Sequence, residues 1–303
     1  MIRSRTAALA AAFLLLGLAP RPARAWDDLG HMVTVRIAWS RLPAATRARI
    51  VALLAQAPAD AGLADLRPAA DADADLMFAA YASTWADLAR RPEPAARHAY
   101  HRASWHYINW FWTETASGAV EESSTLHPDS VNIVSELRRQ SAIVADTTRP
   151  AGERAIALAW VLHLAGDITQ PLHTSSRVTP DHLDGDRGGN LFLLDRPMSL
   201  HWYWDRTLSE RHPRESGEGD DAYVARVAAL VAPRAPADTM GADVERWARG
   251  AFALAEHDVY CCGIVEGSAA PPEYLTHADA IAEPAIALAG VRLAALLERL
   301  LGT

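Results

Sequence analysis

The sequence has 303 residues, of which 50% are apolar, and a formal net charge of −8 at pH 7. This length and composition are enough for a full-sized hydrophobic core, in one large domain or two small ones. The acidic balance disfavours a protein that holds a polyanion nonspecifically on a basic surface. The chain has only two cysteines, and they are adjacent, which excludes a framework of disulfides between distant segments.

Residues 1–25 have the three parts of a secretory signal peptide. Two arginines give a positive start, "AALAAAFLLLGLA" is apolar but too short to span a bilayer, and "ARA" is a small-x-small cleavage pattern. We therefore expect cleavage before Trp26, which leaves residues 26–303 as a single domain. No later segment has an unbroken apolar run of about 20 residues. The sequence thus predicts a secreted or periplasmic protein with no stable membrane association.

In the rest of the chain, apolar residues recur mostly at helical spacing. The clearest sets are Val33, Ile37 and Leu42; Ile50, Leu53 and Leu54; Ile133, Leu137 and Ile143; Ile156, Trp160 and Leu164; and Val224, Val227 and Leu230. Residues 285–301 form a strongly amphipathic closing helix. Strand-like alternation is scarce, and "NLFLLD" at residues 190–195 is its best example. We predict an all-α fold, a mainly helical single domain with long loops, little or no β-structure and no parallel sheet.

Two stretches, residues 113–130 and 173–190, have the composition of long loops. Neither resembles a flexible interdomain linker, because the motifs on both sides of each belong to one expected site. The adjacent Cys261 and Cys262 leave two interpretations open, a strained vicinal disulfide or two buried thiols. We assign them no catalytic role.

The most informative segment is "HLAGDITQPLH", which runs from His163 to His173. His163 and Asp167 are four residues apart on an expected helix, so their side chains share one face and can bind one ion. Pro171 stops that helix, and His173 follows just beyond it. The segment therefore predicts ligands that point to more than one metal position.

A second His/Asp pair, His201 and Asp205 in "HWYWD", has the same spacing and suggests a second metal position. The alternative for either pair alone is an ordinary hydrogen-bonded pair on a helix surface. Further candidate ligands argue against that alternative, namely Asp87 in "TWADLARR", His106 in "WHYIN" and His31. This mixture of nitrogen and carboxylate donors suits zinc.

Trp26 becomes a candidate ligand once the signal peptide is removed. Its α-amine would titrate near 7.7 to 8.0, so part of it is neutral at physiological pH. Together with the carbonyl oxygen of the same residue, this amine can chelate a metal in a five-membered ring. Cleavage before Trp26 would therefore create a metal ligand.

Taken together, these motifs resemble the zinc-dependent nucleases of the fungal S-one/P-one type, which share a superfamily with bacterial zinc phospholipases C. The resemblance spans residues 26–303 and rests on "WDDLGH", "WAD" followed by Arg90, "WHYIN", "HLAGDITQPLH", "GGN" and "LHWYWD", in the family's order. It implies a mainly helical fold and three Zn²⁺ per chain.

The resemblance also assigns the ligands of the three ions. The first zinc would be held by Asp87, His106, His163 and Asp167. Its close neighbour would be held by the amine and carbonyl of Trp26, by His31 and again by the bridging Asp167. The third zinc would be held by His173, His201 and Asp205, and completed by water.

The implied activity is hydrolysis of single-stranded DNA and RNA, with a 3'-nucleotidase activity beside it. Water that loses its proton between the close zinc pair would attack phosphorus in line and leave 5'-phosphate ends. Asp87 and Asp167 would hold that pair, and Arg90 would stabilise the extra negative charge of the transition state. A surface arginine paired with a carboxylate is the alternative for Arg90.

Tyr107 and Asn109 are the candidate substrate-binding residues. Tyr107 follows His106 where the family places an aromatic ring that stacks on a base, and a buried core tyrosine is the alternative. Asn109 stands where fungal relatives carry an acidic residue, so base preference is expected to differ. Thr169 and Ser199 also depart from the family pattern. Single-stranded nucleic acid and nucleotides are thus the expected partners, with no obligate protein partner.

Two other functions remain open at this point. A zinc phospholipase C shares the ligand scheme but typically has Glu four residues after the last histidine, where this chain has Asp205. A non-catalytic periplasmic zinc-binding protein would need only enough ligands to complete the coordination of each zinc ion. Hydrolysis also requires an open coordination position and a nearby group that stabilises charge.

Overall fold

The structure is a computed structural model that describes residues 26–69, 73–195, 198–237 and 241–302. The predicted signal peptide lies outside these residues. The chain is mainly helical, which confirms the predicted fold class. The α-helices are α1 (Asp28–Arg41), α2 (Ala44–Leu54), α3 (Ala74–Ala89), α4 (Ala95–His98), α5 (Ile133–Ala145), α6 (Ala151–Asp167), α7 (Leu200–Asp205), α8 (Thr207–Arg211), α9 (Asp220–Val231), α10 (Val244–Leu254) and α11 (Pro272–Leu301).

Side-chain caps fix the start of several helices. The Asp27 carboxylate accepts from the Gly30 amide at the start of α1, and Asn132 and Ser135 form a reciprocal capping box on α5. Such caps satisfy amides that have no partner within the helix, and each contributes about 1 kcal/mol. The start of α1, which carries His31, is therefore set by the residue that follows Trp26.

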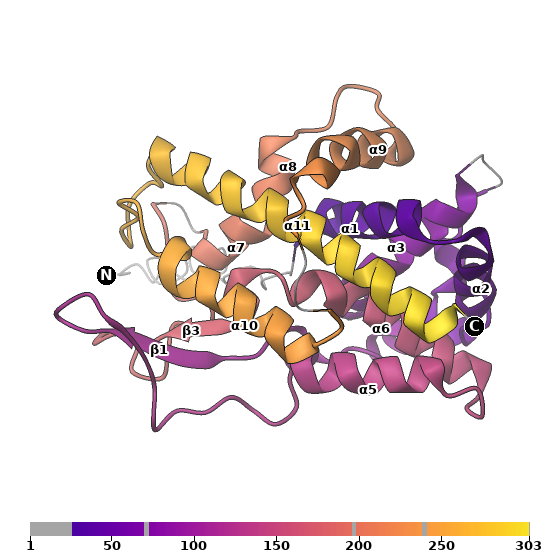
Figure 1. Ribbon diagram of the computed structural model, residues 1–303, viewed down its shortest axis with the longest axis horizontal. Coiled ribbons are helices and arrows are strands. Elements are labelled where there is room, and N and C mark those ends of the chain that lie inside the picture. Colours follow the sequence, from indigo (N-terminus) through magenta and orange to yellow (C-terminus); the bar gives the residue numbers. More distant parts are fainter. Residues whose placement is uncertain (1–25, 70–72, 196–197, 238–240, 303) are drawn as a thin grey trace, which may run out of the picture.

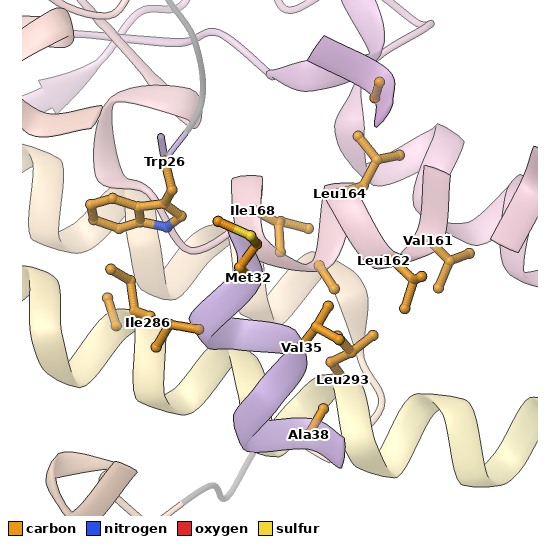
Figure 2. Packing of buried hydrophobic residues seen from close by; sticks show 14 of the residues in the cluster. Trp26, Met32, Val35, Ala38, Val161, Leu162, Leu164, Ile168, Ile286 and Leu293 are labelled. Atoms are coloured by element: carbon orange, nitrogen blue, oxygen red, sulfur yellow. The ribbon is translucent and has the colours of Figure 1, made fainter. Parts of the chain in front are cut away.

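The core lies where α1 crosses α6 and α11. Figure 2 shows side chains of α1 (Met32, Val35, Ala38), of α6 and the residue after it (Val161, Leu162, Leu164, Ile168) and of α11 (Ile286, Leu293) gathered between these helices. The close approach of α1 and α11 depends on Gly290, because a Cβ there would lie 2.6 Å from Ile37 Cβ. Figure 1 shows α11 running across the molecule beside α1. Three helices packed in this way give the site a rigid base.

α11 has 30 residues and is long and apolar enough to cross a membrane by length and composition, although charged residues interrupt its apolar run. However, 67% of its most apolar window is buried against the rest of the fold. In this structure α11 therefore serves as a core helix.

A small sheet at one end of the molecule corrects the strand predictions (Figure 1). β1 (Trp110–Glu114) lies between β2 (Val120–Glu122), which is antiparallel to it, and β3 (Ser175–Arg177), which is parallel to it. The prediction of no parallel sheet did not anticipate this one parallel pair within a mixed sheet. Residues 190–195 form no strand and make only an isolated bridge between Leu193 and Ser199. β2 and β3 lie inside the two segments expected to be loops, and both are too short for alternation to reveal them.

The structure shows the bonding of the two cysteines and the burial of four tryptophans. Cys261 and Cys262 form a disulfide, and Cys262 is exposed, so the buried-thiol alternative is wrong. Trp110, Trp112 and Trp204 are buried, whereas Trp202 is half-buried.

Candidate metal centre

Five of the predicted ligands meet in the interior, and we call them the inner cluster: His31, Asp87, His106, His163 and Asp167. They come from α1, α3, the end of a short 3-10 helix η3 (Ala103–His106), and α6. Each is at most 4% exposed. Helices that are distant in sequence thus converge on one buried group of nitrogen and carboxylate donors.

Asp167 lies at the centre of the inner cluster. Its Oδ1 is 3.2 Å from His31 Nε2, whereas its Oδ2 is 3.1 Å from His163 Nε2 and 3.0 Å from His106 Nδ1. The two oxygens of one carboxylate therefore face different histidines. This is the geometry required of a carboxylate that bridges two close metal ions.

The protonation of His163 follows from its neighbours. His163 Nδ1 lies 2.7 Å from the Ser83 carbonyl oxygen, which can only accept, so Nδ1 carries the hydrogen. In the neutral ring Nε2 then keeps its lone pair, which points toward His106 Nδ1 at 3.0 Å. A backbone carbonyl that fixes the ring in this way is the usual support of a metal-binding histidine.

A second buried group, which we call the outer cluster, consists of His173, His201 and Asp205. His173 lies on the 3-10 helix η4 (Pro171–His173), and the other two lie on α7. Each is at most 5% exposed, and their donor atoms all lie within 4.8 Å of one another. The i, i+4 spacing of His201 and Asp205 is helical, as predicted.

In the outer cluster, the Nε2 atoms of the two histidines face each other, and each carries a lone pair. His173 Nδ1 donates to the His106 carbonyl and His201 Nδ1 donates to the Gly188 carbonyl, both at 2.6 Å. Their Nε2 atoms are 3.2 Å apart. Two neutral imidazoles cannot bond to each other in this arrangement, because neither Nε2 carries a hydrogen. Two nitrogens bound to one tetrahedral zinc would be about 3.3 Å apart, so the geometry fits a cation between them.

Burial shifts the pKa values of several residues in the two clusters. Burial lowers the pKa of His106 to about 4, and burial together with the nearby His173 lowers that of His201 to about 3. These imidazoles are therefore neutral at physiological pH, as metal ligands must be. Burial raises the pKa of Asp205 well above its usual range, and repulsion from Asp87 and Asp167 adds to this.

Buried polar atoms that lack a hydrogen-bond partner also indicate that the clusters fit a metal ion. Within the described residues, Asp87 Oδ2 and Asp205 Oδ2 have no hydrogen-bond partner, and Asp87 Oδ1 has no contact of this kind beyond its ion pair with Arg90. Buried groups left in this way cost about 1–3 kcal/mol each, and more when charged. A cation would satisfy them, and the mixture of imidazole and carboxylate donors suits zinc.

The parallel pairing of β1 and β3 links the two clusters. Trp110 pairs with Ser175, and just before this pair the Ile108 amide donates to the His173 carbonyl at 2.8 Å. This ladder holds the segment that carries His106 beside the segment that carries His173. The strands absent from the sequence prediction therefore set the spacing between the clusters.

The predictions did not include the residues that support the outer cluster. Gln170 Nε2 donates to Asp205 Oδ1 at 2.8 Å. Asp186 accepts from the Tyr260 hydroxyl and from the Arg177 amide, and so anchors the turn that presents the Gly188 carbonyl. Gly188 has φ +63°, and a Cβ there would meet the Leu172 carbonyl oxygen at 2.3 Å. Of these supports, only "GGN" gave a signal in the sequence.

Trp26 lies beside both clusters, although its role as a ligand stays a prediction. Its side chain is fully buried, and its indole N–H donates to Thr169 Oγ1 at 3.3 Å. The next amide, that of Asp27, donates to the Asp205 carbonyl at 2.8 Å. The backbone at residue 26 is therefore held between the segments that carry Asp167 and Asp205.

The candidate catalytic and substrate residues lie around the inner cluster. Arg90 caps the end of α3, with Nη2 3.2 Å from Asp87 Oδ1, and its side chain is 21% exposed. Tyr107 is 36% exposed, so it is not a buried core tyrosine. Asn109 is half-buried between Tyr107 and β1. Ser199, one departure from the family pattern, caps α7 by accepting from the Trp202 amide at 3.1 Å.

Comparison with known proteins adds an independent observation. Residues 26–302 match a family model described as "S1/P1 Nuclease", a range that includes every residue of both clusters. Nuclease S1 of Aspergillus oryzae is 25% identical over 293 residues, which cover 90% of this chain and 91% of that protein. Endonuclease 2 of Arabidopsis thaliana is 32% identical over 162 residues, which cover 48% of this chain and 52% of that protein. The chain thus spans about half the length of Endonuclease 2 and most of Nuclease S1.

Proposed function

Because the chain belongs to the S1/P1 nuclease family, we propose that it is a zinc-dependent nuclease that hydrolyses single-stranded DNA and RNA. We further propose 5'-phosphate products and a 3'-nucleotidase activity. The observation that carries the metal dependence is the pair of Nε2 atoms of His173 and His201, 3.2 Å apart with no hydrogen between them.

Three zinc ions would be held as the two clusters suggest. Asp87, His106, His163 and Asp167 would bind the first ion. Trp26, His31 and the second oxygen of Asp167 would bind its neighbour, and the outer cluster would bind the third. Zinc in such a site lowers the pKa of bound water and stabilises charge on phosphoryl oxygens.

The protein's own groups would position the phosphate. Burial raises the pKa of Asp167, but the surrounding inner histidines outweigh burial and hold this pKa well below its usual range. Asp167 would therefore remain a carboxylate throughout the reaction. The Arg90 guanidinium, partly exposed beside Asp87, would contact the phosphoryl oxygens as negative charge grows on them.

Tyr107 would bind the base next to the cleaved bond. Its ring is exposed beside His106, and stacking on an aromatic ring accepts every base. A paired base cannot reach such a ring without leaving its stack, so single strands would be preferred. The Asn109 amide can both donate and accept, which would relax the choice among bases.

The proposed cellular location rests on the signal-peptide pattern of residues 1–25. We propose that residues 1–25 are a signal peptide, that residues 26–303 form one exported domain, and that the protein is periplasmic or secreted. Its partners would be single-stranded nucleic acid and nucleotides, with no stable membrane association and no obligate protein partner. The Trp26 side chain is buried and bonded to Thr169, two residues after Asp167, so cleavage here would place the new amine near the inner cluster.

The test uses mature protein exported from a bacterial host and loaded with zinc. We expect cleavage of single-stranded DNA and RNA to 5'-phosphate ends, with little cleavage of duplexes and none of phosphatidylcholine. Arg90→Lys keeps the charge but loses the planar fork, and should slow cleavage about 10- to 100-fold at unchanged zinc content. Hydrolysis of phosphatidylcholine alone would assign the site to a phospholipase instead.

A further inference from the structure

A third group of potential metal donors lies apart from both clusters, where a π-helical segment η6 (Ala255–Val259) leads into α11. Cys261, Cys262 and His277 each place one donor atom within 4.8 Å of those of the other two. Cys261 and Cys262 follow η6, and His277 lies on the first turns of α11. The proposed nuclease reaction uses none of these residues.

The two cysteines are placed for a change of redox state. As a disulfide they cannot bind a metal through thiolates. Cys261 Sγ lies 3.1 Å from the Asp258 carbonyl oxygen, and a reduced thiol there would have a hydrogen to donate, which a disulfide sulfur lacks. Cys262 is exposed on the turn, so an external thiol can reach its sulfur. The surroundings therefore suit the reduced form as well as the oxidised one.

His277 is already oriented by a carboxylate. Its Nε2 lies 3.1 Å from Asp258 Oδ1, and the two side chains are 30% and 28% exposed. A carboxylate bonded to a metal-binding histidine fixes the ring and raises its basicity. Asp258 thus supplies to His277 the kind of support that carbonyls supply to the histidines of the two clusters.

We propose that Cys261, Cys262 and His277 form a redox-gated site for a thiophilic divalent cation, with Asp258 orienting the imidazole. A dithiol reductant breaks the bond between the two sulfurs, which take up two electrons and two protons while the dithiol becomes a disulfide. The cation then displaces both protons and binds two thiolates and one imidazole. Two sulfurs on tetrahedral zinc lie about 3.8 Å apart. In the structure the two sulfurs are bonded to each other, so after reduction they would move apart to this distance.

The site can be observed separately from the catalytic metals. The chain has only two cysteines, and neither belongs to the inner or the outer cluster. Absorption from sulfur-to-metal charge transfer therefore reports on this site alone. Cleavage of single strands, measured on the same sample, reports on the clusters alone.

The experiment titrates cadmium into the zinc-loaded full chain after reduction with a phosphine. We expect charge-transfer absorption that saturates at about one cadmium per chain and is absent without reduction and in Cys262→Ser. Asp258→Asn should weaken cadmium binding about 10- to 100-fold, and His277→Gln at least as much. His257→Gln, which changes an exposed histidine of η6, should leave it unchanged.

Two results would overturn the proposal. One is the absence of charge-transfer absorption in the reduced wild-type protein, and the other is equal cadmium affinity in His277→Gln and wild type. Alkylation of the reduced wild-type cysteines gives the same test as Cys262→Ser without a new variant. Since cadmium absorption and nuclease activity are separate readouts, failure of either proposal can be distinguished from failure of the other.

Discussion

The inner and outer clusters consist of the same kinds of side chain but are held in place differently. Four of the five inner ligands stand on α1, α3 and α6, helices of 14 to 17 residues that pack in the core. The outer ligands stand on η4 and on α7, which has only 6 residues. Packing therefore fixes the inner geometry, whereas bonds to the Gly188 and His106 carbonyls and from the Gln170 amide fix the outer one.

This difference implies that the clusters respond differently to mutation. A ligand held by core packing keeps its position when one hydrogen bond is lost, because the interior around it is close-packed. A ligand on a short helix depends on each supporting bond. Changes around the ligands should therefore remove the outer metal before the inner pair.

The largest effect should come from Asp167→Asn, because one carboxylate contacts three inner histidines. We expect it to lose the inner metal pair and to slow single-strand cleavage at least about 10³-fold, since an amide neither bridges two cations nor carries charge. The matched variant Asp205→Asn should lose only the outer ion. Zinc content and cleavage rate measured on both variants check the contrast, and full zinc content in Asp167→Asn would refute the bridging role.

The next effect should come from Gly188→Ala. A side chain at φ +63°, with its Cβ 2.3 Å from the Leu172 carbonyl oxygen, must displace the turn that supports His201. We expect loss of the outer ion, about 100-fold slower cleavage and destabilisation beyond about 1 kcal/mol. In Gly166→Ala, the new Cβ would lie 2.9 Å from His31 Nδ1 and press on the inner cluster instead. If both variants lose the same ion, the two clusters are not held independently.

A smaller effect should follow from Gln170→Met, which removes the hydrogen bond to Asp205 but keeps the side-chain size. We expect affinity for the outer ion to fall about 10- to 100-fold, with the inner pair retained. Gln140→Met is the control, because Gln140 is equally buried but bonds to Glu136, away from both clusters. Competition with a zinc chelator gives the affinities. Identical zinc affinities in Gln170→Met and Gln140→Met would contradict a supporting role for Gln170.

The smallest effect should come from Tyr107→Ala, which touches neither set of ligands. Loss of base stacking is worth about 1–3 kcal/mol, so we expect KM to rise about 5- to 150-fold, with kcat changed much less. Tyr107→Phe keeps the ring and should behave like the wild type. Steady-state rates on a short single-stranded oligonucleotide measure both constants, and an unchanged KM in Tyr107→Ala would remove Tyr107 from the substrate site.

The sequence predicted the helices well, and also which candidate ligands lie close together, because both leave periodic signals. His163 and Asp167 share a helical face, as do His201 and Asp205, and the structure places each pair in one buried group. The apolar spacing at residues 133–143, 156–164 and 285–301 likewise predicted helices that the structure contains. Patterns that repeat every three or four residues can be read without knowledge of the tertiary contacts.

The supports of the ligands leave no such signal. Ser83 and Gly188 act through backbone carbonyls, which every residue has. Tyr260 reaches Asp186 across 74 positions, a pairing that only the tertiary fold creates. β3 has only three residues and sits in a segment rich in Gly and Asp, so its parallel pairing with β1 could not be seen in advance. These contacts depend on the packed fold and not on local sequence.

The most direct test is to remove all metal from the mature protein with a chelator and to measure single-strand cleavage as zinc is returned. The two clusters predict no cleavage without zinc, and recovery of activity as about three zinc ions bind per chain. Cleavage at the full rate by the metal-free chain would contradict a metal centre in these clusters. Three bound zinc ions without cleavage of any single strand would contradict the nuclease and point to a zinc-binding protein.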